Sequence, residues 1–193
     1  MLNLDQSMVV EEDPAESELQ PVQPSPSYKL GDDFEQMKNA TIMMVDDEPI
    51  TMEVVRAFLE DAGYCNFILV EDSTRAMAHL RDCRPDLLLL DVVMPEVSGF
   101  DILGMLRQEP EFAQIPVIIL TSSSDAVTKL QALDQGATDF LSKPVDPSEL
   151  ALRVRNTLAA KAYQDQLAYY DLLTNLPNRR LFSERTAWSI DNA

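Results

Sequence analysis

Residues Asp86–Gly99 read DLLLLDVVMPEVSG and carry the strongest strand signal of the sequence. Its four consecutive leucines, residues 87–90, show neither helical nor alternating spacing, which predicts a strand buried on both faces, as in parallel sheets covered by helices. The run ends at the carboxylate of Asp91. Ligands bind at the carboxyl ends of the strands in open α/β sheets, so we expect Asp91 to lie at a binding edge.

Similar apolar runs flank this strand, and a helical pattern follows each of them. The predicted strands cover residues 41–45, 67–70, 87–90, 117–120 and 140–141. The helical patterns run from Pro49 to Gly63, from an N-cap at Ser73 through Leu80, through Ile102 and Leu106, from an N-cap at Asp125 to Gly136, and from Pro147 onward. Five strand and helix pairs in strict alternation predict an α/β fold, a doubly wound parallel sheet with right-handed crossovers and helices on both faces.

The composition limits the class of protein. A chain of 193 residues, 46% of them hydrophobic, favours one domain with extensions. The formal net charge of −18 argues against binding nucleic acid, because no basic face is available to displace counterions. The sequence contains no apolar stretch typical of a membrane span or an export signal, so we expect a cytoplasmic protein that does not bind membranes. Cys65 and Cys83 fit that compartment as reduced, half-buried side chains, and a disulfide between them is the alternative.

Both ends of the chain depart from this pattern. Residues 1–37 contain nine acidic residues against Lys29 alone, with four prolines, and we expect a flexible acidic arm. The arm is either a solvated tail or a docking or autoinhibitory segment. Residues 146–170 contain no glycine, and no proline after Pro147, so the last helix is expected to continue beyond the domain as a connector. This connector either pairs with a second copy to form a homodimer or packs on the surface.

Polar side chains follow four of the predicted strands. Asp46 and Asp47 follow the first, Asp91 ends the third, Thr121 ends the fourth and Lys143 ends the fifth. These residues converge at one edge of a parallel sheet, where the three carboxylates repel one another unless a cation intervenes. Carboxylate oxygens suit Mg²⁺. Asp91 is then a candidate nucleophile for in-line phosphoryl transfer, with Lys143 drawing charge from the phosphoryl group and Thr121 bonding one of its oxygens.

Four motifs at these strand ends together resemble the receiver domain of two-component response regulators, over about residues 41–160. They are Val45-Asp46-Asp47, Leu90-Asp91 followed by Met94-Pro95 and Gly99, Leu120-Thr121-Ser122, and Leu141-Ser142-Lys143-Pro144. The resemblance implies a flavodoxin-like (CheY-like) fold with strand order 2-1-3-4-5 and an extended C-terminal helix. It also implies a regulatory phosphoacceptor rather than an enzyme.

The resemblance also assigns roles in the metal site. Asp91 matches the phosphoacceptor, and Asp46 and Asp47 match the acidic pair that binds Mg²⁺ together with Asp91. Val93 matches the position whose backbone carbonyl completes the metal shell. The resemblance therefore implies Mg²⁺ as the cofactor.

The remaining roles concern the switch and the phosphodonor. Thr121 and Lys143 match the hydroxyl and the amine of the family, Phe140 matches the aromatic residue that reorients with the hydroxyl, and the Lys143–Pro144 bond is expected to be cis. His79 is the only histidine and is expected to be an ordinary residue of a surface helix. The phosphoryl group is therefore expected from a sensor histidine kinase, a phosphotransfer protein or a small acyl phosphate.

The C-terminal residues 171–180, DLLTNLPNRR, resemble the D-x-L-T-x-L-x-N-R-R opening of the GGDEF domain of diguanylate cyclases. The resemblance implies that residues 171–193 are the truncated beginning of such a domain, in which Asp171 pairs with Arg179 or Arg180. The catalytic residues of that family lie further downstream, so we expect these 193 residues not to make cyclic di-GMP. The longer parent protein is expected to have an output that acts on cyclic di-GMP; a diguanylate cyclase is one form of it, and whether the output makes or degrades the messenger stays open.

Two alternatives remain at this point. The first is an aspartate-nucleophile phosphohydrolase of the haloacid dehalogenase type. That family places its nucleophile in a D-x-D motif on the first strand, whereas Asp91 ends the third and is followed by Val92-Val93. The second alternative is a receiver fold that acts only as a docking surface, without phosphorylation.

Overall fold

The computed structural model describes residues 37–122, 126–171, 174, 176 and 178. All elements below belong to the unit Gly31–Ala193. Four expectations lie wholly or mostly outside the described residues: the acidic arm apart from Met37, the N-cap at Asp125, the pairing of Asp171 with Arg179 or Arg180, and the truncated GGDEF beginning at residues 171–193.

Five parallel strands form one sheet in the order β2-β1-β3-β4-β5, so the predicted fold is confirmed. The strands are β1 (Thr41–Val45), β2 (Asn66–Val70), β3 (Leu87–Asp91), β4 (Val117–Thr121) and β5 (Asp139–Ser142). β3 lies in the centre, and all five of its residues are buried. Leu88 and Leu90 pack into the core on one face of the sheet, while Leu87 and Leu89 pack into the core on the other. This two-sided burial is the reason why β3 has no alternating pattern.

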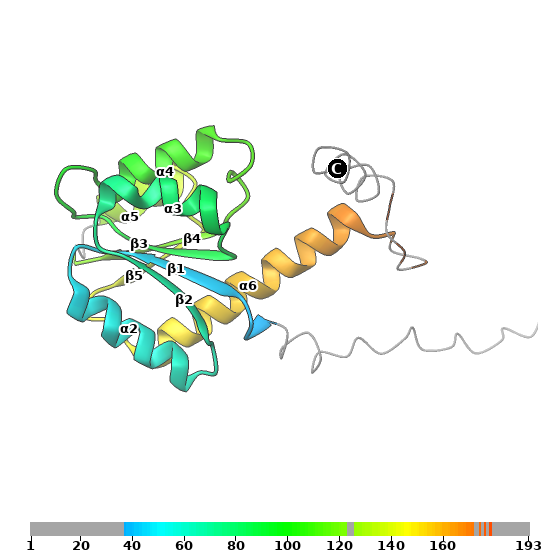
Figure 1. The fold of residues 1–193 in the computed structure, drawn as a ribbon, viewed down its shortest axis with the longest axis horizontal. Coiled ribbons are helices and arrows are strands. Elements are labelled where there is room, and N and C mark those ends of the chain that lie inside the picture. The colour runs from blue at the N-terminus through cyan, green and yellow to red at the C-terminus, as the bar shows by residue number, and fades with distance from the viewer. Residues whose placement is uncertain (1–36, 123–125, 172–173, 175, 177, 179–193) are drawn as a thin grey trace, which may run out of the picture. The chain divides into compact units, whose positions relative to one another are not determined.

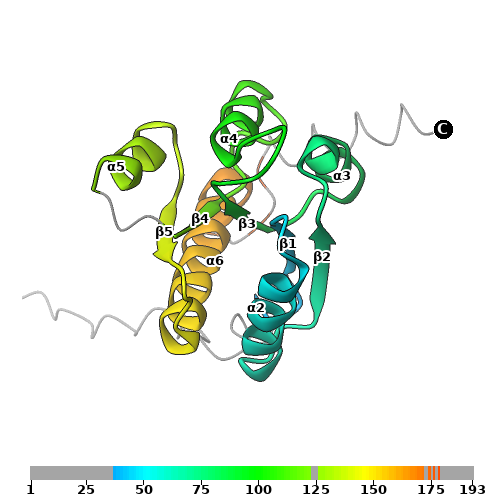
Figure 2. The same ribbon diagram turned by 90° about the vertical axis from the view of Figure 1, so that its left-hand side faces the viewer.

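Helices cover both faces of the sheet. They are α2 (Pro49–Asp61), α3 (Ala76–Cys83) with the short 3₁₀ turn η1 (Ser73–Arg75) before it, α4 (Gly99–Gln108), α5 (Ala126–Asp134) and α6 (Pro147–Tyr169). α3, α4 and α5 lie on one face, and α2 and α6 lie on the other (Figures 1 and 2). Because the five strands are parallel, they all end at the same edge of the sheet, and this edge carries the candidate site.

Several apolar side chains that recur at helical spacing are exposed. In α2, Val55 and Leu59 are buried, but Ile50 is 81% exposed. In α5, Val127, Leu130 and Leu133 are exposed. Helical spacing identifies a shared apolar stripe, but it does not establish that the whole stripe faces the sheet.

Two local expectations are wrong. Ser73 does not cap a helix through its side chain, because the Asp72 carboxylate accepts the hydrogen bond from the Thr74 N–H at the start of η1. Cys65 and Cys83 are exposed rather than half-buried, and both are free thiols. Neither cysteine packs in the core, and they do not form the alternative disulfide.

The last helix, α6, is continuous over 23 residues. The Asp146 carboxylate caps it by accepting a hydrogen bond from the Glu149 N–H. In its first half, the side chains of Leu150, Val154 and Leu158 are buried. Tyr163 and Leu167, further along, are exposed. The length of α6 agrees with the expected extension, while its pairing with a second copy stays a prediction. In the described part of the chain, no helix combines the length and apolar character needed to cross a membrane.

Candidate functional site

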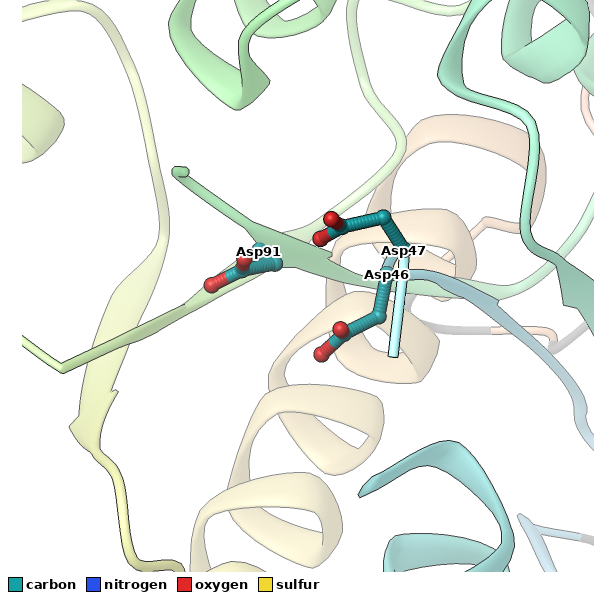
Figure 3. A group of neighbouring side chains, drawn as sticks. All are labelled: Asp46, Asp47 and Asp91. Carbon is teal, nitrogen blue, oxygen red and sulfur yellow. The ribbon is translucent and has the colours of Figure 1, made fainter. Parts of the chain in front are cut away.

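Three aspartates meet where β1 and β3 end (Figure 3). In the parallel pairing of these strands, Val45 lies opposite Leu90, so the residues that follow them reach the same edge. The side chains of Asp46, Asp47 and Asp91 each place one carboxylate oxygen within 4.8 Å of the others. The predicted acidic cluster is therefore present.

Lys143 bridges two of these carboxylates. Its ammonium nitrogen Nζ lies 2.7 Å from Asp46 Oδ2 and 3.1 Å from Asp91 Oδ1. The Lys143 backbone N–H donates to the Thr121 carbonyl at 2.8 Å, and the Lys143–Pro144 bond is cis, as expected. The sequence-predicted amine thus faces Asp91, although it comes from the other side of β4.

Burial and charge shift the pKa values of this pair. Burial raises the pKa of Asp91, and the nearby Asp46 charge raises it too, while the Lys143 ammonium partly offsets both effects. Burial alone would lower the pKa of Lys143, but hydrogen bonding and attraction to Asp46 and Asp91 outweigh it and raise that pKa. Lys143 is therefore a permanent positive charge in the site at neutral pH.

The donor set fits a hard divalent cation. Three carboxylates and one ammonium leave a formal charge of −2 (three negative charges against one positive). Asp46 Oδ1 accepts from the Glu48 N–H at 2.9 Å, which fixes the orientation of this carboxylate, and Asp47 is exposed, which leaves room for water. Mg²⁺ prefers oxygen ligands and retains several waters, so the residues present fit it.

Thr121 and Phe140 lie on the two strands next to this cluster. Thr121 ends β4, is 1% exposed and lies opposite Ser142 of β5 in the strand register. Phe140 of β5 is half-buried, and the Lys129 ammonium lies 4.9 Å from the centroid of its ring. Both residues lie on the strands predicted for them, and their roles in binding the phosphoryl group and in the switch stay predictions.

The loop after Asp91 contains features that sequence reasoning missed. A Cβ on Gly99 would lie 2.0 Å from the Asp91 carbonyl oxygen, so only glycine lets α4 begin this close to β3. Ser98 and Asp101 form a reciprocal capping box at the start of α4, which the spacing Ser-x-x-Asp could have indicated. The Ser73 hydroxyl donates to the Pro95 carbonyl oxygen, a contact between distant segments that no local pattern signals.

Comparisons with known proteins agree with this geometry. The family profile of the response regulator receiver domain matches residues 42–155. Response regulator Rre1 of Synechocystis sp. is 40% identical over 119 residues, which cover 62% of this chain and 52% of that protein. The chain thus spans about half the length of the curated relatives it matches. Other relatives are named as DNA-binding regulators, so they lend no support to the expectation that nucleic acid is not a partner.

Solved structures show the same fold. Two high-resolution structures of the chemotaxis response regulator CheY4 of Vibrio cholerae have TM-scores of 0.57 and 0.58 against this chain. In both, the identity is 28%, and the match covers 62% of this chain and 98% of that one. The Mn²⁺-bound form of response regulator Rcp1 has a TM-score of 0.53 at 26% identity, covering 61% and 90%. The sheet order, the acidic edge and the family match together establish that this chain belongs to the response regulator receiver family.

Proposed function

We propose that Asp91 accepts a phosphoryl group in a Mg²⁺-dependent reaction and that this switches a C-terminal output. The observation that carries the proposal is the Lys143 ammonium, which lies between the carboxylates of Asp46 and Asp91 at the end of the sheet. A lysine with no role beyond solvation would remain exposed at the surface, because burial disfavours its positive charge.

Each group in the cluster has a role in the transfer. An Asp91 carboxylate oxygen attacks the phosphorus atom of the donor, a bond forms between them, and the bond from phosphorus to the donor atom breaks with its electron pair leaving on the donor. Lys143 and Thr121 hydrogen-bond oxygens of the transferred group. Asp46, Asp47, Asp91 and the Val93 carbonyl would hold Mg²⁺, which supplies a positive charge that stabilises the phosphoryl oxygens.

The switch follows from the charge added at Asp91. An aspartyl phosphate brings additional negative charge and new acceptor oxygens, which favour the arrangement in which Thr121 and Lys143 bond to it. Phe140 lies on β5 opposite Ile119, two residues before Thr121. Its ring is proposed to reorient when the Thr121 hydroxyl moves toward the phosphoryl group. The free energy that shifts the population cannot exceed the difference in the strength of these bonds between the two states.

A sensor histidine kinase or a phosphotransfer protein is the proposed partner. An apolar patch lies directly after the acidic pair, where Ile50 and Val54 are exposed at the start of α2. Together with Pro49, Glu53 and Ala57 they line a shallow depression. A histidine-bearing protein that brings its phosphoryl group to Asp91 would cover this patch, since it must approach the same edge of the sheet.

The proposed output is a GGDEF domain that begins at Asp171. The Asp171 carboxylate accepts from the Thr174 N–H and hydroxyl, and the Asp171 N–H donates to the Leu176 carbonyl. Asn178 bonds back to the end of α6 through the carbonyls of Ala168 and Tyr169. The residues of the D-x-L-T-x-L-x-N motif that are described thus form a closed turn on the connector, which supports a fixed entry to a further domain.

A DNA-binding output is the second candidate, favoured by the names of relatives such as the master regulator RpaA of Synechocystis sp.. The net charge of −18 argues against DNA binding by these 193 residues themselves. The sequence of the gene past Ala193 distinguishes the two: a GGDEF signature supports the first candidate, and a basic recognition helix supports the second.

Labelling with a small phosphodonor tests the phosphoacceptor proposal. The wild-type chain, incubated with acetyl phosphate and Mg²⁺, should gain one acid-labile phosphoryl group per chain, and Asp91→Asn should gain none. Labelling that persists in Asp91→Asn refutes the assignment, and an unlabelled wild type supports the docking-only alternative. Sustained release of phosphate from a monoester in excess of protein would instead support the haloacid dehalogenase alternative.

A further inference from the structure

The Ser73 side chain lies between two loops at the edge of the sheet that carries the acidic cluster. Ser73 begins η1, shortly after β2, and only 6% of it is exposed. Its hydroxyl donates to the Pro95 carbonyl oxygen at 2.8 Å. Capping of η1 does not require this hydroxyl, because the Asp72 carboxylate accepts from Thr74. The Ser73 hydroxyl therefore connects the segment after β2 to the loop after β3.

The Pro95 carbonyl is a central acceptor in that loop. It also accepts from the Val97 N–H at 2.7 Å, so two donors fix its direction. Glu96, between them, has a φ of 65°, the left-handed conformation that costs ~1 kcal/mol or more for a residue with a Cβ. A strained loop persists only where surrounding contacts hold it, and the Ser73 bond is one of these contacts.

The position of this loop affects the proposed metal site. Val93, two residues before Pro95, is the residue whose carbonyl is proposed to bind Mg²⁺. Its side chain is 71% exposed, so side-chain packing does little to fix its backbone. The chain on either side of Val93 holds it instead. Val92 and Met94 pack in the core, the Val92 N–H donates to the Leu120 carbonyl, and the Gly99 N–H donates to the Val92 carbonyl. Beyond Met94, the Ser73 hydroxyl holds the Pro95 carbonyl.

We propose that Ser73 is a positioning residue, whose hydroxyl holds the loop after Asp91 so that the Val93 carbonyl is available to the metal. The inference rests on the proposed function, because it assumes that Mg²⁺ binds beside Asp91. It adds a residue outside the four motifs, on a different strand connection, to those that determine metal affinity. Hydrogen-bonding partners of metal ligands commonly have such effects.

Calorimetric titration with Mg²⁺ alone tests this on the full 193-residue chain. Ser73→Ala removes the donor, and we expect the dissociation constant for Mg²⁺ to rise roughly fivefold, the effect of one typical hydrogen bond. Thr74→Ala is the matched control, because it removes a neighbouring hydroxyl that bonds Asp72 rather than the loop. Ser73→Thr keeps a hydroxyl and should retain most of the affinity.

The rate of phosphorylation from acetyl phosphate, measured against Mg²⁺ concentration, provides the second readout. Ser73→Ala should slow the reaction at low Mg²⁺ and match the wild type at saturation, since only the metal affinity changes. Equal Mg²⁺ affinity in Ser73→Ala and the wild type overturns the inference, as does an equal loss in Thr74→Ala. A wild type that binds no Mg²⁺ overturns the proposed metal-dependent function instead, so the two failures are distinct.

Discussion

The Lys161 ammonium lies 2.9 Å from Asp86 Oδ1, at the end of β3 opposite to Asp91. The other oxygen of this carboxylate, Oδ2, accepts from the Thr41 N–H at 3.0 Å, and the Asp86 N–H donates to the Thr41 carbonyl. Asp86 thus links the starts of β1 and β3, through its hydrogen bonds to Thr41 and its ion pair with Lys161, to the second half of α6. The connector helix is held to the receiver beyond its last buried residue, Leu158.

Lys161→Met should loosen the end of α6 without changing the proposed phosphoacceptor site. The pair is partly exposed, so its loss should cost ~1 kcal/mol or less of stability, but it should raise amide hydrogen exchange in residues 161–169. Lys161→Arg preserves the charge and serves as control. Unchanged protection in Lys161→Met would show that packing alone holds the helix.

Gly99→Ala should destabilise the domain. The added Cβ would meet the Asp91 carbonyl oxygen at 2.0 Å, and two backbone segments must separate to relieve the overlap. We expect a loss of about 2–3 kcal/mol in the free energy of unfolding, measured by urea denaturation. Gly104→Ala, in the same helix, meets nothing within 4 Å and should instead stabilise by about 0.5–1 kcal/mol. Equal effects of the two substitutions would contradict this account.

The capping box of α4 should make stability depend on pH. Hydrogen bonds from the Ser98 hydroxyl and N–H lower the pKa of Asp101 below its ordinary value. A lowered pKa in the folded state means that the carboxylate contributes stability above the unfolded pKa, about 3.9, and loses it as pH falls through the folded value. Asp101→Asn should therefore be less stable than the wild type at pH 7, with a difference that shrinks toward pH 3.

Urea denaturation at both pH values measures this difference. In a Ser98→Ala background the Asp101→Asn substitution should have a smaller effect, because the partner that lowers the pKa is gone. A difference between wild type and Asp101→Asn that is constant with pH would contradict the capping role.

Ile50→Ser should distinguish the two kinds of phosphodonor. The side chain is 81% exposed and close in sequence to Asp47, but it is not part of the acidic cluster. We expect transfer from a histidine-bearing protein to slow by roughly tenfold, the effect of losing one good apolar anchor, while the rate with acetyl phosphate is unchanged. Val127→Ser, at an apolar residue of α5 that is 67% exposed, is the control. A slower reaction with both donors would mean that Ile50 acts on the site itself.

The sequence predicted the sheet well because each strand has a strong local signal. The leucines of β3 form an apolar run that faces the core on both sides of the sheet. The polar residues Asp46, Asp91 and Thr121 come at the ends of such runs, so their convergence follows from parallel pairing. Parallel pairing is a global rule that needs only the order of the elements.

What could not be predicted depends on contacts between distant segments. The Ser73 hydroxyl bonds Pro95, 22 residues further on, and a local N-cap pattern gave the wrong partner. Helical spacing does not predict the exposure of Ile50 and Leu130, because it describes one helix, whereas burial depends on what packs against that helix. Such contacts appear only when the chain is placed in three dimensions.

Lys143→Met should make folding depend more strongly on Mg²⁺. Removing the ammonium leaves the carboxylates of Asp46 and Asp91, both nearly buried, without their bridging charge. We expect a loss of about 2–4 kcal/mol in the free energy of unfolding without metal, because uncompensated buried charges are costly. A divalent cation takes over part of the missing charge, so Mg²⁺ should raise the urea midpoint of the variant more than that of the wild type. Lys143→Arg keeps a positive charge and should respond to Mg²⁺ as the wild type does. If Mg²⁺ stabilised all three proteins equally, the cation would be binding somewhere other than the cluster that Lys143 bridges.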